Sequence, residues 1–382
     1  MNASCRYLIM AGGTGGHIFP AMAVARALTN NGSEIHWLGT EKGMESQLVP
    51  SEGIPLHLIP IKGFRGKGLF AKLSIPLLLL VSIVQAMKII VRVNPKVVVG
   101  FGGYVAAPGG IAARLLGKKL IVHEQNSVAG STNKLLSKIA SSNLEAFPNS
   151  LPRAIRVGNP VRTELKKLFH QDRGGLENGS RKKLLIMGGS LGAAAINQVM
   201  PGVMSKIDPE ARPEIWHQAG KNKHEELIAD YKNDEVSARV DEFIKDVSVA
   251  YEWADIIICR AGALTVSEVA VAGIPAIFIP YPYAIDNHQF HNAEWLVKNE
   301  ASHLIEQKDL TIDKLNGLLQ TLLSDESQLN EMSARLKKLA IPDATDKVVW
   351  VCEKACRNES MNIVGLKNEI ERMSMGDNNN AA

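Results

Sequence analysis

The chain has 382 residues, too many for one ordinary hydrophobic core and enough for two domains of typical size, which excludes a small single-domain protein. Its apolar content of 46% and charged content of 21% are typical of a soluble globular protein. The net charge of +4 conceals an asymmetry, because residues 1–160 carry +11 and the remaining residues −7. A basic first half beside an acidic second half indicates that the first half meets an anionic partner, either nucleic acid or a membrane.

The N-terminus and the cysteines favour a cytosolic protein. Glycines interrupt the first apolar run almost at once, so the N-terminus lacks the charged-then-apolar pattern of a signal peptide. No two cysteines form a C-x-x-C pair, and we therefore expect all four to be reduced, ordinary residues. They are Cys5, Cys259, Cys352 and Cys356.

The first motif is the glycine-rich stretch Ala11–Pro20. It follows a short apolar run, Tyr7–Met10, that is typical of a buried strand, and it precedes a helical pattern that continues to Leu28. Glycines at such a turn let the backbone approach a ligand closely, and N–H groups at the helix start attract anions. The stretch is not the dinucleotide fingerprint, because Ile18 stands where its last glycine would be. A tight turn without a ligand is the alternative, although His17 has no packing reason to follow the glycines.

Strands and helices then alternate along the chain. A polar, aperiodic loop at 171–181 separates two series, and each series opens with a glycine-rich strand-to-helix turn, the second at Gly188–Gly192. The fold class is therefore α/β, with two Rossmann-like parallel-sheet domains facing each other across a cleft. Further strands are expected at residues 34–39, 56–61, 96–100, 120–123, 183–187, 214–218, 255–259 and 275–280.

Three polar sites in the second half are candidates for binding. Gly262 permits a turn after a buried strand, and the helix that follows aims its N-terminus at the cleft, with Glu268 placed to accept hydrogen bonds from a ribose. The polar run Asp286–Gln289 suits sugar hydroxyls, and Arg162 could hold a phosphate. The alternatives are an exposed helix carboxylate for Glu268, a helix N-cap for Asp286 and an exposed charge for Arg162.

Motifs for metal binding and for covalent catalysis are absent from the sequence. There is no D-x-D, H-E-x-x-H or paired C-x-x-C, and neither a nucleophile elbow nor the G-x-x-x-x-G-K-[ST] loop occurs. We therefore expect no metal and no cofactor, and a nucleotide held by backbone amides, helix N-termini and arginine.

Taken together, the motifs of this chain resemble those of the bacterial peptidoglycan N-acetylglucosaminyltransferases, in the same order, from about Tyr7 to Val348. The resemblance implies the GT-B fold, with an acceptor and membrane-facing domain at 1–160 and a UDP-GlcNAc-binding domain at 161–345. It also implies a helix at about 346–357 that packs back on the first domain, followed by a partly disordered tail at 358–382. The motifs are Gly12–His17, Gly102–Tyr104, His123–Asn126, Gly158–Arg162, Gly188–Ser190 and Ala263–Glu268.

The resemblance also assigns roles to individual residues. Leu191 and His288 depart from the family pattern where relatives often have glutamine. Apart from the resemblance, we expect His17 to be the general base, because histidine titrates near neutrality; the alternative is that His17 only caps or orients the loop. Glu268 is expected at the ribose, Ile244 at the uracil through its backbone, and Gln289 at the sugar hydroxyls. The full set of expected substrate-binding residues is Thr14, Gly15, Gly16, Asn126, Arg162, Ser190, Ile244, Ala263, Leu264, Thr265, Val266, Ser267, Glu268 and Gln289.

The implied activity is inverting transfer of N-acetylglucosamine from UDP-GlcNAc to undecaprenyl-pyrophosphoryl-MurNAc-pentapeptide, the lipid I to lipid II step of peptidoglycan and cell wall biogenesis. It implies a peripheral enzyme at the cytoplasmic face of the cell inner membrane, with an anionic membrane surface and cell-wall synthesis proteins as partners and no nucleic acid. Two alternatives stay open: a non-hydrolysing UDP-GlcNAc epimerase and a non-enzymatic nucleotide sensor.

The segment Lys62–Val93 is the expected membrane contact. Its 15 uncharged residues between Lys72 and Lys88 would span about 22 Å as a helix, short of the roughly 30 Å hydrocarbon core, so we expect docking rather than crossing. The alternative is a helix buried against the sheet. Basic residues bracket the run and suit anionic lipid; they are Lys62, Arg65, Lys67, Lys72, Lys88 and Arg92.

Overall fold

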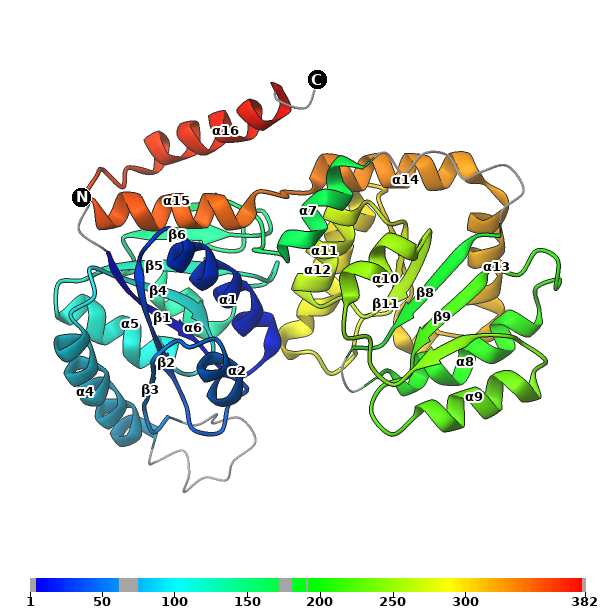
Figure 1. The fold of residues 1–382 in the computed structure, drawn as a ribbon, viewed down its shortest axis with the longest axis horizontal. Helices are drawn as coiled ribbons and strands as arrows, with labels where there is room; N and C mark the ends of the chain where they lie inside the picture. The colour runs from blue at the N-terminus through cyan, green and yellow to red at the C-terminus, as the bar shows by residue number, and fades with distance from the viewer. Residues whose placement is uncertain (1–4, 62–74, 172–180, 190–191, 380–382) are drawn as a thin grey trace. The chain divides into compact units, whose positions relative to one another are not determined.

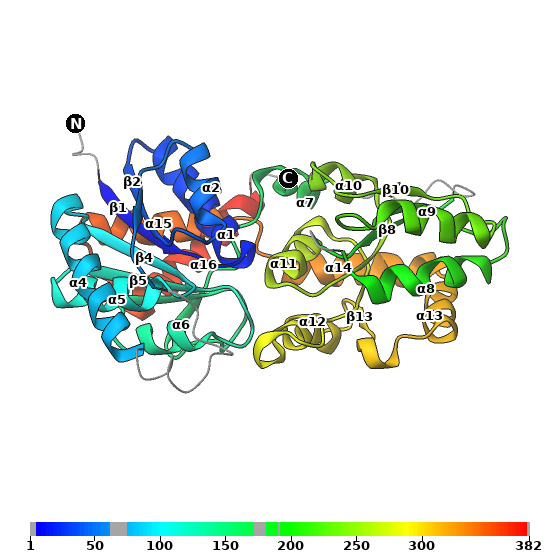
Figure 2. The ribbon, with the colours of Figure 1, turned by 90° about the horizontal axis from the view of Figure 1, so that it is seen from below.

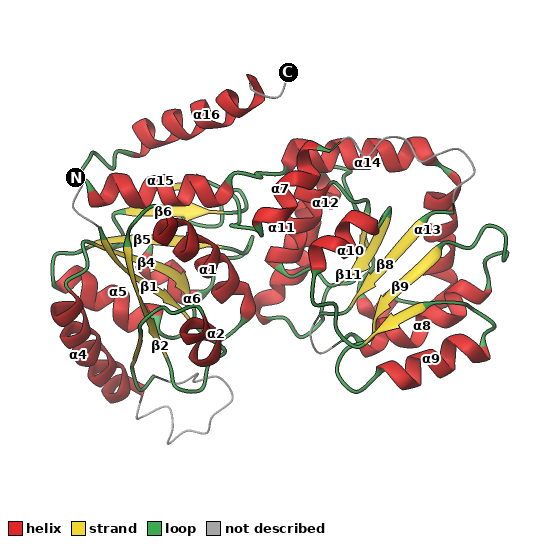
Figure 3. Cartoon of the chain, viewed as in Figure 1, coloured by secondary structure: helices red, strands yellow, loops and turns green. Residues whose placement is uncertain are grey.

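The computed structural model describes residues 5–61, 75–171, 181–189 and 192–379. Contacts divide the chain into two compact units (Figure 1). Unit 1 comprises Met1–Val161 and Asp343–Ala382, and unit 2 comprises Arg162–Pro342. Each unit is built on one parallel sheet with helices packed against it, as Figure 3 shows, which is the α/β architecture that the sequence predicts.

The sheet of unit 1 has seven strands in the order β3-β2-β1-β4-β5-β6-β7, all parallel. Strand β1 lies near the middle, and its side chains alternate between two separate cores. The strands are β1 Arg6–Ala11, β2 Glu34–Gly39, β3 Leu56–Leu58, β4 Val97–Gly102, β5 Lys119–Glu124, β6 Ser142–Glu145 and β7 Ala154–Arg156.

Helices cover both faces of this sheet. Tyr7 and Ile9 of β1 belong to the core that α1 and α15 cover, whereas Leu8 and Met10 belong to the core that α4 and α5 cover (Figure 1). The helices of unit 1 are α1 Gly15–Asn30, α2 Glu45–Ser51, α4 Ile75–Val93, α5 Ala106–Leu115, α6 Ser131–Leu136, α15 Ala344–Cys356 and α16 Ile363–Asn379.

The end of the chain returns to unit 1. Helix α15 contributes Val348 and Val351 to the core around β1 and α1. Residues 358–382 were expected to be partly disordered, but within them the structure has α16, whose Leu366 and Ile370 are buried in the same core. Lys354 of α15 forms an ion pair with Glu369 of α16 at 2.7 Å.

The expectation that all four cysteines are reduced is wrong for one pair. Cys5 and Cys356 form a disulfide across a sequence separation of 351 residues, while Cys259 and Cys352 are free and buried. The pairing arises because the residue before β1 and the last residue of α15 lie side by side, with Cα atoms 6.4 Å apart, and no local spacing encodes that contact.

Unit 2 repeats the plan with six parallel strands in the order β10-β9-β8-β11-β12-β13. Figure 2 gives a second view of its helices. The strands are β8 Lys183–Met187, β9 Glu214–Gln218, β10 Arg239–Asp241, β11 Ile256–Cys259, β12 Ala276–Phe278 and β13 His303–Leu304. The helices are α7 Thr163–His170, α8 Ala194–Ser205, α9 His224–Asn233, α10 Val247–Trp253, α11 Ala263–Ala272, α12 His288–Lys298, α13 Ile312–Ser324 and α14 Glu326–Leu339, with short 3₁₀ turns at Ile285–Asn287 and Gln307–Asp309.

Both sheets have a topological switch point, where consecutive strands leave in opposite directions. In unit 1 it lies between β1 and β4, and in unit 2 between β8 and β11. Loops after these strands diverge and leave a crevice at the carboxyl ends, which is where open α/β sheets bind ligands. The glycine-rich turns after β1 and β8 are therefore both at ligand-binding positions of their own units.

Candidate active site

The loop after β1 is shaped by glycines that no other residue could replace without strain. Gly13 has φ +92°, a conformation that L side chains rarely adopt. Gly103 has φ +80°, and a Cβ there would collide with the backbone carbonyl of Gly12. Thr14 then takes the extended N-cap conformation, and its carbonyl accepts the N–H groups of His17 and Ile18, which starts α1. The loop thus presents the first turn of α1 at the switch point.

The buried carboxylate of Glu45 accepts a hydrogen bond from this loop. Glu45 is 0% exposed, and its Oε2 accepts the backbone N–H of Gly13 at 3.2 Å. Its Oε1 accepts the backbone N–H of Thr40 at 3.0 Å and the Thr40 hydroxyl at 2.8 Å. A Cβ on Gly12 would lie 2.8 Å from the same carboxylate, so glycine is required for the fit. Glu45 gives no signal in the sequence, because its partners lie elsewhere in the chain.

His17, at the start of α1, is half-buried and hydrogen-bonded to the loop after β5. Its Nδ1 lies 2.7 Å from Oε1 of Gln125, and Gln125 Nε2 lies 2.9 Å from Nδ1 of His123. Gly102 makes room for the ring, since a Cβ there would lie 3.0 Å from His17 Cε1. Burial lowers the pKa of His123 to about 4, so this second imidazole is neutral at physiological pH.

Glu124 shapes the loop that carries Asn126. It is 1% exposed, and its Oε1 accepts the backbone N–H of Asn126 at 2.9 Å. Its Oε2 accepts the N–H of Gly130 at 3.1 Å and the amide of Asn133 at 2.9 Å. The structure therefore places Thr14–His17 after β1 and Asn126 after β5, two strands of one sheet that are separated by β4.

In unit 2, the corresponding position is the N-terminus of α11. Gly262 is the N-cap residue with φ −60° and ψ 144°, and glycine has no side chain with which to cap the helix. The first turn, Ala263–Thr265, follows β11 directly at the switch point. Such an end, with its positive dipole, is suited to an anion such as a diphosphate.

Glu268 lies in α11 and is not an exposed helix carboxylate, since only 4% of it is exposed. Its Oε2 accepts the hydroxyl of Tyr251 at 3.2 Å, and its Oε1 is 3.4 Å from Nε of Arg162. Burial raises the pKa of Glu268, and the nearby Arg162 guanidinium opposes that rise. Oε1 is buried and accepts no hydrogen bond in the described part of the chain, so this oxygen retains capacity for a donor.

Two further predicted residues of unit 2 lie outside α11. Gln289 Oε1 accepts the N–H groups of Ala261 at 3.2 Å and Tyr281 at 2.9 Å, which joins the loops after β11 and β12. Ile244 follows β10, with its side chain buried. The N-cap alternative for Asp286 is wrong, because Asn287 holds that position of α12.

The structure thus groups the predicted residues by unit. Those in unit 1 are Thr14, Gly15, Gly16, His17 and Asn126, and those in unit 2 are Arg162, Ile244, Ala263, Leu264, Thr265, Val266, Ser267, Glu268 and Gln289. Ser190 and Leu191, together with Lys62, Arg65, Lys67 and Lys72, lie outside the described residues. The residues that sequence reasoning did not assign are Glu45, Glu124, Gln125, His123 and Tyr251.

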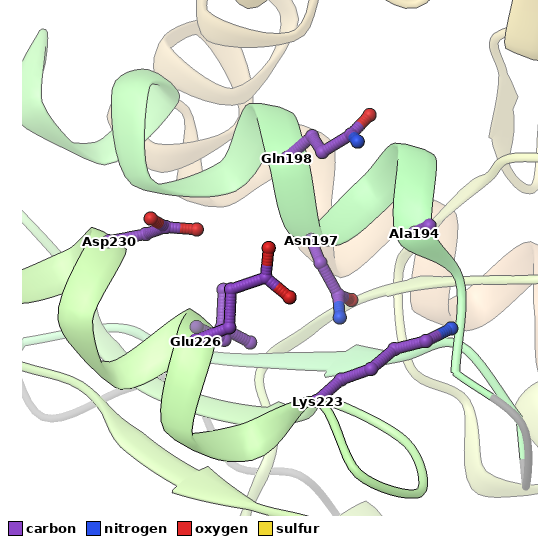
Figure 4. A pocket seen from close by; sticks show the side chains of 7 residues that line it. Ala194, Asn197, Gln198, Lys223, Glu226 and Asp230 are labelled. Atoms are coloured by element: carbon purple, nitrogen blue, oxygen red, sulfur yellow. The ribbon is translucent and has the colours of Figure 1, made fainter.

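The remaining pocket and the acidic, histidine and cysteine side chains of the described residues do not add a site. Figure 4 shows a pocket of about 80 Å³ between α8 and α9, lined by Asn197, Lys223 and Glu226 among others. Its volume is well below the several hundred Å³ that a nucleotide-sized ligand occupies. Among described residues, no group of three or more histidine, cysteine, aspartate or glutamate side chains could hold a metal ion.

Two parallel-sheet units, each with a glycine-rich turn at its switch point, have the architecture of the GT-B class, and comparisons with known proteins identify the chain as a glycosyltransferase of that class. The models for the glycosyltransferase family 28 N-terminal and C-terminal domains match residues 7–144 and 183–348. The chain therefore belongs to glycosyltransferase family 28.

Relatives in the family are similar over almost their whole length. A protein of Ectopseudomonas mendocina named UDP-N-acetylglucosamine--N-acetylmuramyl-(pentapeptide) pyrophosphoryl-undecaprenol N-acetylglucosamine transferase is 49% identical, over 92% of this chain and 98% of the relative. A protein of the same name from Azotobacter vinelandii is 47% identical over 92% and 98%. The crystal structure of Acinetobacter baumannii MurG is 38% identical, with a TM-score of 0.80 over 92% of this chain and 99% of that one. The calicheamicin glycosyltransferase CalG4, with a TM-score of 0.66 at 14% identity, shares the fold.

Proposed function

We propose that this glycosyltransferase transfers N-acetylglucosamine from UDP-GlcNAc to undecaprenyl-pyrophosphoryl-MurNAc-pentapeptide, with inversion at the anomeric carbon. The observation that carries the proposal is the pair of glycine-rich turns at the two switch points, in a chain similar over 92% of its length to relatives named for this reaction. The relatives' name supports transfer over the epimerase alternative.

The donor binds to unit 2. Its diphosphate is held at the N-terminus of α11, and Arg162 supplies a second positive charge. The ribose hydroxyls donate to Glu268, whose buried Oε1 lacks a hydrogen bond in the described chain. Gln289 uses its carbonyl oxygen within the protein and offers its amide group to the sugar hydroxyls. The backbone of Ile244 contacts the uracil.

The acceptor binds to unit 1, where His17 is the general base and Thr14, Gly15, Gly16 and Asn126 line its site. The acceptor hydroxyl oxygen forms a bond to the anomeric carbon as His17 takes its proton. The bond from that carbon to the diphosphate oxygen breaks, and UDP leaves with the electron pair. Positive helix N-termini stabilise the charge that develops on the leaving phosphate, a task that metal ions perform elsewhere.

Incubation with UDP-GlcNAc, with and without the lipid-linked acceptor, tests the reaction. Acceptor-dependent release of UDP together with a disaccharide-bearing lipid is the expected result. Formation of free N-acetylmannosamine without acceptor would show epimerisation, and binding without turnover would show a sensor; either result would contradict the proposal.

We further propose that helix α4 docks unit 1 on the cytoplasmic face of the inner membrane. One face of α4 is core, since Ala86, Ile90 and Val93 are buried against the sheet. The opposite face is apolar as well. Its exposed side chains recur at helical spacing and are Leu77 at 67%, Leu80 at 58%, Val81 at 40%, Val84 at 44% and Val91 at 65%.

Partial burial and charge favour a helix that lies on the membrane over one that crosses it. The window Pro76–Val93 has a mean hydropathy of 1.9, long and apolar enough to cross a membrane, but 28% of it is buried inside unit 1. A helix that covers the core of unit 1 with one face is not free to cross, whereas its exposed face can enter the interface. Lys88 and Arg92 are exposed near its C-terminal end, and each contributes about 1 kcal/mol beside anionic lipid.

Co-sedimentation with vesicles of phosphatidylglycerol and phosphatidylethanolamine tests the docking. Replacing Leu77, Leu80 and Val84 with serine is expected to reduce binding strongly, and raised salt to reduce it further. Ile228, 46% exposed on α9, provides the control, because Ile228→Ser removes exposed apolar surface from unit 2. Equal binding by both variants, or no binding by the unaltered protein at low salt, would show that α4 is an ordinary core helix.

A further inference from the structure

A continuous series of hydrogen bonds within unit 1 links the backbone at Gly158 to His17. His123 Nε2 lies 2.9 Å from the carbonyl oxygen of Gly158, and Gln125 Nε2 lies 2.9 Å from His123 Nδ1. Gln125 Oε1 lies 2.7 Å from Nδ1 of His17. His123 and Gln125 are 0% and 1% exposed, so their partners are those the protein provides. We refer to these residues as the His17 network.

Two backbone carbonyls determine the direction of every bond in this network, because a carbonyl oxygen only accepts. Gly158 O requires a proton on His123 Nε2. Gln125 Nε2 also lies 2.9 Å from the carbonyl oxygen of His123, which requires the –NH₂ end of the amide at that position. The other end, Oε1, therefore faces His17, and since it only accepts, His17 Nδ1 must carry a proton.

The protonation state of the second imidazole, that of His123, is consistent with these hydrogen-bond directions. Burial holds the pKa of His123 at about 4, so the ring is neutral and its only proton is on Nε2. Nδ1 of His123 then accepts the second N–H of Gln125, and no donor opposes another donor anywhere in the network. Asn159 fixes the backbone of Gln125 by donating to its carbonyl oxygen at 3.0 Å.

We propose that Gln125 is a positioning residue that holds neutral His17 as the Nδ1–H tautomer, so that the lone pair of Nε2 is presented to the acceptor hydroxyl. The proposal deepens the proposed function and rests on His17 being its general base. In water, neutral histidine favours the opposite tautomer, in which Nε2 carries the proton and cannot accept another. After proton transfer, both nitrogens carry protons and Nδ1–H still donates to Gln125, so the network needs no rearrangement during the step.

The tautomer is measured directly by nitrogen-15 NMR of the full chain labelled at histidine, at mildly alkaline pH. The His17 signals are identified by their loss in His17→Asn. We expect the Nδ1–H pattern in the unaltered protein and a shift to the Nε2–H pattern in Gln125→Leu. An Nε2–H pattern in the unaltered protein, or an unchanged Nδ1–H pattern in Gln125→Leu, overturns the proposal.

Steady-state kinetics test whether the loss of Gln125 slows turnover. Gln125→Leu is expected to lower kcat at least roughly tenfold, up to the full loss expected on removing His17, with KM for UDP-GlcNAc unchanged. Gln47→Leu is the matched control, since Gln47 is exposed on α2 and should leave both constants unchanged. A tautomer change without a fall in kcat overturns the positioning role.

The experiments distinguish failure of the proposed role of Gln125 from failure of the proposed function. If His17→Ala retains full turnover, His17 is not the base, and the proposed mechanism fails whatever the tautomer. If His17→Ala is inactive while Gln125→Leu is as active as Gln47→Leu, the base assignment stands and the role of Gln125 alone fails. The NMR measurement on the unaltered protein requires no variant of Gln125 to fold.

Discussion

Replacing Glu45 with glutamine should loosen the glycine loop while leaving its packing volume unchanged. The carboxylate uses one oxygen for Thr40, at 3.0 and 2.8 Å, and the other for the N–H of Gly13, at 3.2 Å. A glutamine that keeps its oxygen toward the two Thr40 donors must turn its –NH₂ group toward Gly13 N–H. The substitution therefore removes the hydrogen bond between Glu45 and the backbone N–H of Gly13 in the loop.

The size of the effect follows from the charge on the acceptor. A hydrogen bond to a charged group is worth about 1.5–3 kcal/mol, and a tenfold change in an equilibrium corresponds to about 1.4 kcal/mol. Opening of the loop should therefore become roughly 10- to 150-fold more frequent. Hydrogen–deuterium exchange of a peptide covering residues 11–20 measures that change at the Gly13 amide. Turnover should fall as well, because the same loop begins the helix that carries His17.

The matched control is Glu41→Gln, which removes an exposed carboxylate a few residues earlier in the chain. If Glu45→Gln and Glu41→Gln exchange their loop amides at the same rate, the carboxylate does not support the loop and the reasoning is refuted. Full activity with faster exchange would show that the bond stabilises the loop without serving catalysis.

Three other predictions concern Glu268 in unit 2, His17 in unit 1, and the disulfide between Cys5 and Cys356. Because burial raises the folded-state pKa of Glu268, its ionisation costs stability as pH rises through that pKa. Glu268→Gln should therefore melt no lower than the unaltered protein at neutral pH, lose that advantage in acid, and bind UDP-GlcNAc more weakly. A lower Tm of the variant at neutral pH would contradict the idea that the buried charge of Glu268 costs stability. His17→Ala should lose roughly 10²- to 10⁴-fold in kcat with UDP-GlcNAc binding by calorimetry unchanged, and a parallel loss of binding would indicate a structural role. Reducing the disulfide, or replacing Cys5 and Cys356 with serine, should destabilise unit 1 by about 2–4 kcal/mol in urea unfolding. The double variant treated with the same reductant is the control, because it has no such disulfide to lose and its stability should not change further.

Local patterns in the sequence predict the elements well. The strand expected at 34–39 is β2, and those expected at 183–187 and 214–218 are β8 and β9. In β8 the continuous apolar run Leu184–Ile186 marks a strand buried on both faces. The strand expected at 56–61 is shorter, ending as β3 at Leu58, since Pro60 has no N–H to donate to a ladder. Short strands such as β13, with two residues, have no periodicity to detect.

The supporting contacts of the site were beyond sequence reasoning for a physical reason. Glu45 meets Gly13 from 32 residues away, and Gln125 meets His17 from 108 residues away. Such pairs depend on which strand ends become neighbours, and no repeat or spacing encodes that arrangement. The glycine turn before the helix suggested a ligand role for Glu268, yet its burial and its pairing with Arg162 emerge only from the packing of α11.

The route of the chain through unit 1 sets an order for biosynthesis. The sheet of unit 1 is complete by residue 156, but the core beside β1 waits for α15, which contributes Val348, Val351 and Cys352. A ribosome adding about 5–20 residues per second needs roughly 10–40 s to synthesise residues 162–342 in between. During that interval unit 2 is still being synthesised, and the part of the unit 1 core that α15 completes stays open. A stop codon before residue 343 would leave the core beside β1 covered by α1 but without α15, so truncation late in the gene would damage the first half of the protein.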